Sequence, residues 1–439
     1  MLKTSGLKRY AKNTSWMFVE RIIRVLVVFA VGIPVTRYLG DEQFGMLNYA
    51  AGWVGLFLSM STLGLEEIVV RDLVRDPKRR DELLGTSFLL RTFGAALMVI
   101  VVTLLSWARG NESITITMVF IFSFAELFRG SSVIDQYYQS RVEARKTVRV
   151  QMAQVIVSAL IKLTMVILKV DLVWFAGMVG FELIFLTIGY VKVYHSDGLS
   201  VLKWQASFKS AKYLMSQAWP LIIFGLALFI QARVDQVMLG DILSRVYGRE
   251  FGNKEVGQYS VALKMIEALG FVSVVLQKSL SPAITGAKNK SEELYRDRLL
   301  NQYRLMFLMF LVTAIPLFFL AEPIIVLLYG EQFRPAGALL SLFAIRLFFT
   351  NMGVGKTSFI TNESLFRYSL ITAIVGATIN IAINFYLIEE YKSKGAIVAT
   401  IVSFTASIFI MDLFFKSTRW NLKLMLLAMV TFWKIHKVK

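Results

Sequence analysis

Long apolar stretches separated by short polar ones recur along the whole chain. Each stretch covers roughly 20 residues, which as a helix crosses a hydrocarbon core of about 30 Å. Backbone groups in lipid need hydrogen-bond partners within their own segment, so these stretches are expected to be transmembrane helices. The pattern predicts an all-α polytopic membrane protein with about twelve spans. The predicted spans lie near residues 14–37, 44–65, 86–107, 114–135, 149–168, 171–192, 215–239, 256–279, 303–328, 338–361, 367–388 and 395–415.

A polar segment after the sixth predicted span divides the chain. This segment, residues 198–214, mixes aromatic residues with lysines and is predicted to form a cytoplasmic linker helix on the membrane surface. The prediction is therefore an N-terminal six-helix bundle over 1–197 and a C-terminal six-helix bundle over 215–416. Residues 417–439 carry an apolar run that is too short to span, which predicts a basic interfacial cytoplasmic tail.

The two predicted halves share a short repeated turn. Residues 40–45 (GDEQFG) follow the first span, and residues 252–257 (GNKEVG) follow the seventh. In both places a segment with a tyrosine and then an alanine comes next. With six spans per half, the repeat is parallel and its axis lies along the membrane normal, which is a transporter architecture. We expect the two bundles to surround a central cavity.

The positive charge of the chain follows its predicted topology. There are 48 lysines and arginines against 30 acids, which gives a net charge of +18. If the N-terminus is cytoplasmic, most of these cations fall in inner loops, as in the cluster from Arg71 to Arg80. The prediction is a multi-pass protein of the bacterial inner membrane with both termini cytoplasmic. Basic inner loops face anionic lipid headgroups, so no nucleic-acid partner is needed to explain the charge.

Several chemistries are not expected. The chain has no cysteine, which excludes disulfides, thiolate metal sites and cysteine nucleophiles, and its two histidines, His195 and His436, lack ligand-spaced partners. Gly353-Val-Gly355-Lys356-Thr357 imitates the end of a P-loop, but the earlier glycine is missing and the string lies in a predicted span. We therefore expect no nucleotide site, no metal, no cofactor, no catalytic residue and no enzymatic activity.

Ionisable residues inside the predicted spans are the main candidates for function. A charge near the bilayer centre costs roughly 2.5–3.5 kcal/mol, so each needs a partner or a wet cavity. Several of these residues belong to polar stripes at helical spacing, which predicts that they face a common lumen. Lys162 is expected instead to pair with Glu182 across the hairpin of the fifth and sixth spans. The predicted substrate-binding cations of the lumen are Arg24, Arg91, Arg233, Lys264 and Arg346.

These cations outnumber the buried acids, so an anionic ligand is expected. Arginine matches phosphate oxygens in bidentate geometry, which favours a lipid-linked phosphate or pyrophosphate over a cationic drug. Nucleotide-sugar or other anion transport is also compatible. Without a nucleotide site, a proton or sodium gradient is the expected drive, and a buried acid must then respond to the ion. Glu126 and Asp235 are the candidates; alternatively, they neutralise nearby arginines.

Several segments, in both halves of the chain, carry a family resemblance. They are the turn at 38–45 and its second-half counterpart at 252–257, LLYGEQFRPA at 327–336, ALLSLFAI at 338–345, GATINIAINFYL at 376–387, Tyr391 and GAIVAT at 395–400. Together they resemble Wzx-type polysaccharide (O-antigen and capsule) flippases of the multidrug/oligosaccharidyl-lipid/polysaccharide exporter superfamily. About twelve spans fit this branch better than the fourteen expected of the peptidoglycan lipid flippase.

The resemblance implies two six-helix bundles around a central cavity and an alternating-access mechanism. It implies translocation of an undecaprenyl-pyrophosphate-linked oligosaccharide from the cytoplasmic to the periplasmic leaflet, for surface polysaccharide biosynthesis. The implied partners are this lipid-linked oligosaccharide, membrane lipids, and the polysaccharide polymerase and assembly machinery. One alternative is a multidrug/toxin antiporter of the same superfamily. A membrane glycan polymerase or glycosyltransferase fits less well, because the longest predicted outer loop, 241–255, has only about fifteen residues.

Overall fold

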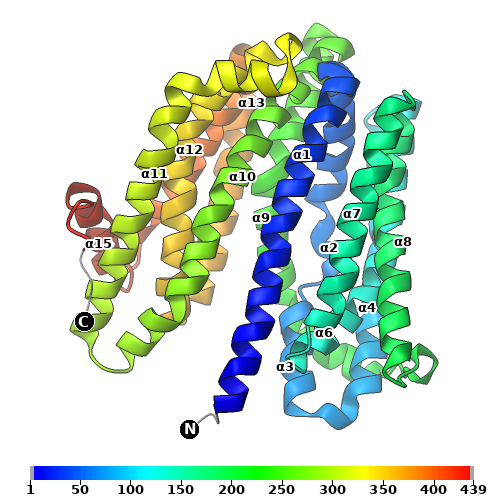
Figure 1. Ribbon diagram of the computed structural model, residues 1–439. Helices are drawn as coiled ribbons and strands as arrows, with labels where there is room; N and C mark the ends of the chain where they lie inside the picture. Colours follow the sequence, from blue (N-terminus) through cyan, green and yellow to red (C-terminus); the bar gives the residue numbers. More distant parts are fainter. Residues whose placement is uncertain (1–3, 436–439) are drawn as a thin grey trace. The chain divides into compact units, whose positions relative to one another are not determined.

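The structure is all-helical throughout the part of the chain that it describes. The computed structural model describes the backbone of residues 4–435 and the side chains of residues 23–435, and every regular element in that range is a helix (Figure 1). Ten of these helices are long and apolar enough to cross a membrane. The predicted all-α membrane class is thus confirmed. The ends of the predicted N-terminal bundle and tail, residues 1–3 and 436–439, lie outside the described residues, and so does His436.

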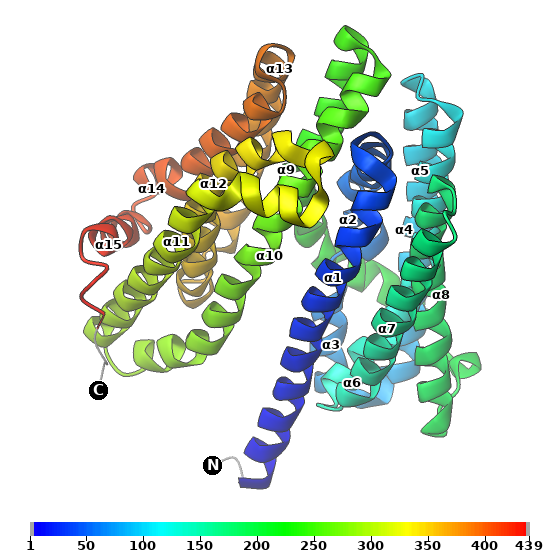
Figure 2. The same ribbon diagram turned by 45° about the horizontal axis from the view of Figure 1, so that its top comes forward.

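Two of the ten long helical segments contain a turn. Helix α1 (Thr4–Leu56) is non-helical at Gly40, and α13 (Phe366–Thr405) is non-helical at Lys392. The Ser403 hydroxyl donates to the carbonyl of Gly376 at 2.8 Å, although a straight helix would separate these residues by about 40 Å. α13 therefore doubles back, and Figures 1 and 2 show α1 doing the same before it reaches α2 (Leu58–Thr62). Counting both arms of each gives the twelve predicted spans.

The contacts of the chain divide it into two compact units. The first unit comprises Met1–Leu39 and Met46–Phe229. Its core includes the fully buried side chains of Tyr138 and Tyr194. After α1 and α2 its elements are α3 (Glu66–Arg75), η1 (Pro77–Arg79), α4 (Arg80–Ala108), α5 (Ser113–Ala125), η2 (Glu126–Ser132), α6 (Val133–Ser140), α7 (Arg145–Ile167), α8 (Leu172–Ser196), η3 (Val201–Lys203) and the start of α9 (Phe208–Tyr247).

The predicted linker helix over 198–214 does not form as one helix. Its residues make the short 3₁₀ turn η3, a non-helical stretch up to Ser207, and then the first turns of α9. The reason is packing against α4 and α8: the Trp204 ring lies 5.6 Å from that of Phe88 and 5.9 Å from that of Tyr194. The amide of the next residue donates to a carbonyl at the start of α4 instead of continuing a helix. Tertiary contacts therefore outweigh local helix propensity here.

The second unit comprises Gly40–Gly45 and Ile230–Lys439. In the predicted tail, α15 (Arg419–Val430) packs against α11 (Glu292–Tyr329), where the Tyr303 hydroxyl donates to Asn421 Oδ1 at 2.8 Å. The remaining elements of this unit are the end of α9, α10 (Arg249–Lys288), η4 (Glu331–Phe333), α12 (Arg334–Asn362), α13, the π-helical η5 (Ala406–Ile410) and α14 (Met411–Phe414).

The two turns that the sequence relates pack against each other within the second unit. A β-carbon on Gly45 would lie 1.7 Å from the carbonyl oxygen of Asn253, and one on Gly257 would lie 2.0 Å from that of Asp41. These contacts are reciprocal, because Gly45 and Asp41 hold the same repeat positions as Gly257 and Asn253. Only glycine permits such an approach of two backbones, as in small-residue packing between membrane helices.

Candidate functional site

In the first unit, Glu126 is paired with Arg129, a cation of its own 3₁₀ segment. Glu126 begins η2, a 3₁₀ segment inside the long helical stretch 113–140. Residues i and i+3 eclipse in a 3₁₀ helix, so Arg129 lies directly over Glu126. The Arg129 Nε and Nη2 groups donate to the two Glu126 carboxylate oxygens, and the Ser61 hydroxyl adds a third hydrogen bond at 2.9 Å. Both oxygens of Glu126 are therefore used.

Arg91 lies on α4 with only 3% of its surface exposed. Its Nη1 donates to the Ser132 hydroxyl at 2.8 Å, at the end of η2, while its Nε is buried without a hydrogen-bond partner. Among the described residues it forms no ion pair with a carboxylate, and Glu126 is already taken by Arg129. Its Nε–H is therefore a hydrogen-bond donor that no group of the described structure uses.

The other cations of the first unit that the sequence placed inside spans are either more exposed than Arg91 or paired with an acid. Arg24 lies on α1 and is partly exposed. Lys162 of α7 donates to Glu182 of α8 at 2.7 Å, which confirms the predicted pair. Lys162 is therefore neutralised across its hairpin.

Asp235 is the centre of a buried polar cluster in the second unit. It lies on α9 with 3% of its surface exposed. Its Oδ2 accepts hydrogen bonds from the hydroxyls of Tyr259 and Thr400, each at 2.6 Å, and its Oδ1 accepts one from Asn384 Nδ2 at 2.7 Å. The cluster joins α9 and α10 to both arms of α13. All three donors are neutral, and among the described residues no cation forms an ion pair with Asp235.

Oxygen atoms predominate around this carboxylate. Asn384 Oδ1 is buried without a hydrogen-bond partner, and Asn380 Oδ1 accepts from Asn384 Nδ2 at 3.2 Å. One carboxylate with amide and hydroxyl oxygens suits a proton or a hard monovalent cation. Within the described part of the chain, no group of three or more His, Cys, Asp or Glu side chains could hold a metal ion.

Arg346 is linked to this cluster through aromatic rings. Its guanidinium carbon lies 5.7 Å from the centroid of Phe343 and 5.4 Å from that of Phe404. The Phe343 ring in turn packs edge-on against Tyr259, with 5.1 Å between centroids, and Tyr259 donates to Asp235. Arg346 Nε is buried without a partner, and no carboxylate of the described residues pairs with this side chain. Rings stabilise the guanidinium without occupying its donors.

The two other predicted cations of the second unit lie near the surface of the α9–α10 pair. Arg233 approaches Glu267 at 3.7 Å, and about a third of each side chain is exposed. Lys264 is exposed, with its ammonium 4.2 Å from the centroid of the Phe44 ring. Among the cations predicted for the lumen, Arg91 and Arg346 thus combine burial of Nε with the absence of an ion pair in the described structure.

Sequence reasoning missed several polar partners. Arg129 was not among the predicted site residues, yet η2 holds it against Glu126. Asn384 and Thr400 were noted only within the family resemblance, although Asn380 and Asn384 stand four residues apart on one helix face, a usable signal for a polar site. Lys356 was considered only as part of a false P-loop, and it is buried in an ion pair with Asp412.

Asp197, which lies outside the membrane-spanning helices, also pairs with a lysine. Asp197 follows α8 and accepts hydrogen bonds from Lys146 Nζ at 2.5 Å and from the Tyr138 hydroxyl at 2.7 Å. The hydrogen bond from Lys146 is the main reason that the pKa of Asp197 lies below its usual value. This pair fixes the end of α8 to the start of α7.

A known protein family matches most of the sequence. The model of a family described as polysaccharide biosynthesis protein matches residues 35–338, which is more than half of the chain. No curated protein matches the sequence.

Solved structures share the fold. A multidrug resistance MATE family transporter of the MOP superfamily, in an inward-facing conformation, has a TM-score of 0.66 and 14% identity, with 90% of this chain and 97% of that chain covered. The lipid II flippase MurJ, in an inward closed conformation, has a TM-score of 0.65 and 13% identity, with 96% and 92% covered. A MOP superfamily transporter from Pyrococcus furiosus, described as having a binding pocket of reverse polarity, has a TM-score of 0.55 and 12% identity, with 95% and 94% covered. At these identities the likeness establishes the fold.

Proposed function

The chain belongs to the polysaccharide biosynthesis protein family and has the fold of MOP superfamily transporters, and on that premise we propose that it is a flippase for a lipid-linked oligosaccharide. The substrate is an undecaprenyl-pyrophosphate-linked repeat unit, which moves from the cytoplasmic to the periplasmic leaflet of a bacterial inner membrane. Both termini are cytoplasmic in this proposal, and the polysaccharide polymerase and assembly machinery work beside it.

The observation that carries the proposal is the state of two arginines, Arg91 and Arg346. Each has a buried Nε–H without a partner, and neither forms an ion pair among the described residues. A buried guanidinium that no acid neutralises is costly unless an anion occupies it for part of the cycle. A pyrophosphate offers the oxygens that a guanidinium binds in bidentate geometry. Alternating exposure of these cations to the two leaflets carries the headgroup across.

Asp235 is the proposed site of energy coupling. Its charge is balanced by neutral donors, so a proton or sodium ion can bind there without first displacing a basic side chain. Arg346 contacts Phe343, and Phe343 contacts Tyr259 of the cluster. Ion binding at Asp235 therefore changes the electrostatic surroundings of an anion-binding arginine. Glu126 is not a coupling site in this proposal; its role is to neutralise Arg129.

The solved neighbours name two kinds of cargo, lipid II for MurJ and drugs for the MATE transporter. Unneutralised arginines favour the lipid-linked anion over the cationic drug, because a cationic substrate requires acids and aromatic rings in their place. A multidrug antiporter remains the second candidate function, since it shares the fold.

Deletion and complementation in the source strain test the proposal. Deletion is expected to leave the lipid-linked oligosaccharide in the cytoplasmic leaflet and to stop delivery of the surface glycan. Arg91→Gln and Arg346→Gln, each at wild-type membrane abundance, are expected to restore at most about a tenth of delivery, since a charge-assisted hydrogen bond contributes about 1.5–3 kcal/mol.

The matched control removes a cation that is already neutralised. The double variant Lys162→Gln/Glu182→Gln loses one charge of each sign from the α7–α8 pair and is expected to restore delivery fully. Intact glycan delivery in the deletion strain, together with new sensitivity to cationic toxins, overturns the flippase and favours the antiporter.

A further inference from the structure

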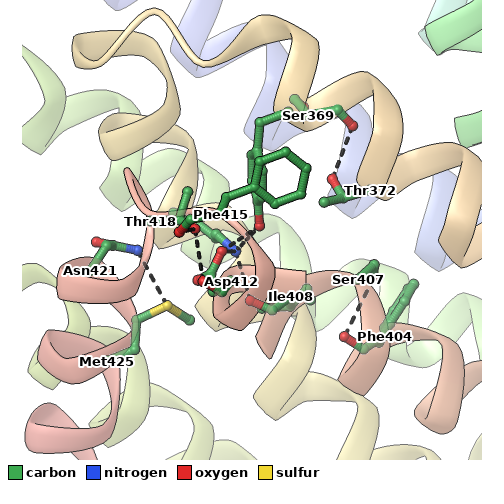
Figure 3. A network of polar contacts seen from close by, with 12 residues as sticks. Ser369, Thr372, Phe404, Ser407, Ile408, Asp412, Phe415, Thr418, Asn421 and Met425 are labelled. Atoms are coloured by element: carbon green, nitrogen blue, oxygen red, sulfur yellow. Dashed lines mark hydrogen bonds and ion pairs between the residues drawn. The ribbon is translucent and has the colours of Figure 1, made fainter. Parts of the chain in front are cut away.

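A second buried acid in the second unit has no role in the proposed translocation. Asp412 of α14 is completely buried, and its Oδ1 lies 2.8 Å from Nζ of Lys356, whose side chain on α12 is 4% exposed. The Lys356 ammonium also donates to the Tyr368 hydroxyl at 2.8 Å and to the Ile408 carbonyl at 2.7 Å. All three ammonium donors are therefore used. Figure 3 shows Asp412, Ile408 and the surrounding hydrogen bonds.

The two carboxylate oxygens of Asp412 differ in their hydrogen bonds. Lys356 and the Tyr368 hydroxyl both donate to Oδ1, whereas Oδ2 is buried without a hydrogen-bond partner. A buried carboxylate oxygen without a donor costs free energy, and a proton on that oxygen removes the negative charge that is responsible for most of this cost. Glu126 differs in this respect, because both of its oxygens accept hydrogen bonds.

The backbone that Lys356 holds is irregular. Ile408 belongs to η5, a five-residue π-helical segment between α13 and α14. Short π segments interrupt a helix at a cost and occur often at functional sites. Lys356 contacts a carbonyl inside this segment and a carboxylate four residues later, so the lysine clamps the π segment to α12.

Few other polar groups face this acid. Tyr368 comes from α13, and α11 contributes Tyr303, whose hydroxyl donates to the neutral amide of Asn421 on α15. Thr418 donates to the backbone carbonyl of Asp412. Among the described residues Lys356 is the one charged side chain paired with Asp412, so the site as a whole is neutral.

We propose that Oδ2 of Asp412 is a proton-binding site that releases the Lys356 clamp. One proton from water binds Oδ2 and turns the carboxylate into a neutral acid, while Lys356 remains an ammonium ion. The site then carries one uncompensated positive charge, which weakens the pairing of Lys356 with Asp412 and frees the π segment to rearrange. Loss of the proton restores the pair. Its use in transport rests on the proposed function, but proton binding itself does not.

Infrared difference spectroscopy of the full chain in lipid, titrated between about pH 8 and pH 5, tests proton binding directly. The expected result is a carboxylic-acid C=O band that appears on acidification, is absent in Asp412→Asn and remains in Asp235→Asn. The same band in Asp412→Asn overturns the proposal, as does a wild-type protein that shows no such band.

Lys356→Met provides an independent test that keeps the acid and the approximate volume of the lysine stem. Without the cation the protonated form is favoured, so the midpoint of the Asp412 band is expected to move up by about two pH units. An unchanged midpoint overturns the proposal, even if Asp412→Asn fails to fold. If the band behaves as expected but the protein does not flip lipid-linked oligosaccharide, the proposed function fails while the proton site stands.

Discussion

Glu126 and Asp235 are both buried acids, one in each unit, and their neighbours differ in charge. Glu126 accepts hydrogen bonds from a guanidinium and a serine hydroxyl, whereas Asp235 accepts three from neutral groups. A carboxylate already paired with arginine gains little from another cation, while one balanced only by dipoles still attracts it. The partners of a buried acid, more than its burial, therefore decide whether it stabilises the fold or binds an ion.

Of the substitutions that test this difference between the two acids, Asp235→Asn is expected to have the largest effect on glycan delivery. The variant removes the charge and places an amide where Tyr259 and Thr400 both donate. Glycan delivery in the deletion strain is expected to fall about a hundredfold or more, because the coupling ion loses its charged ligand and buried donors are left unpaired. Delivery at the wild-type level, at equal membrane abundance, would show that Asp235 is not the coupling site.

Glu126→Gln is expected to affect stability instead of coupling. It leaves Arg129 without its counter-charge beside Arg91, and the free energy of unfolding in detergent should fall by about 2 kcal/mol, allowing for the partial exposure of Arg129. The double variant Glu126→Gln/Arg129→Gln should recover most of that loss, while glycan delivery by either variant stays near wild type. Loss of delivery without loss of stability would reverse the roles assigned to the two acids.

Tyr259→Phe removes one of the three hydrogen bonds to Asp235 without touching the charge. A net hydrogen-bond contribution of about 1 kcal/mol predicts delivery about fivefold below wild type. Tyr329→Phe is the matched control, since the one hydrogen bond of that buried hydroxyl among the described residues is to the sulfur of Met265, at 3.8 Å. Equal glycan delivery by both variants would show that the hydrogen bond from Tyr259 does not affect the function of Asp235.

The smallest effect concerns Asp197, a partly exposed acid paired with Lys146. Asp197→Asn is expected to lower the free energy of unfolding by only about 0.5 kcal/mol at neutral pH. The pKa of Asp197 is lowered in the folded protein, so the pair stabilises the fold above the usual pKa of an aspartate, and this contribution disappears as the pH falls through the folded value. Wild type and variant should therefore converge in acid. A difference that persists there would argue against the ion pair as its cause.

Hydropathy predicted the spans well, because every stretch long enough to cross a bilayer became a helix. Pairs close in sequence were also predictable: Lys162 and Glu182 lie on adjacent helices of one hairpin, and they meet. Pairs distant in sequence were not. Lys356 and Asp412 meet only because α12 and α14 are rotated so that both side chains point inward, and no hydropathy window records that rotation.

The backbone also departs from regular geometry at positions that periodicity does not reveal. The 3₁₀ segment η2 places Arg129 over Glu126, and the π segment η5 presents the Ile408 carbonyl to Lys356. A helical wheel at 3.6 residues per turn misplaces side chains across both segments. Glu126 and Asp235 were therefore both predictable as acids inside the spans, whereas the one that an arginine neutralises was not.

Flipping of lipid-linked oligosaccharide in proteoliposomes tests the central claim most directly. The substrate is extracted from the deletion strain, and movement between leaflets is followed with an imposed proton or sodium gradient and without one. We predict that one of the two gradients accelerates flipping by the wild-type protein and by Glu126→Gln, and that neither accelerates flipping by Asp235→Asn. Gradient-driven flipping by Asp235→Asn, or no flipping by the wild-type protein, would contradict the account.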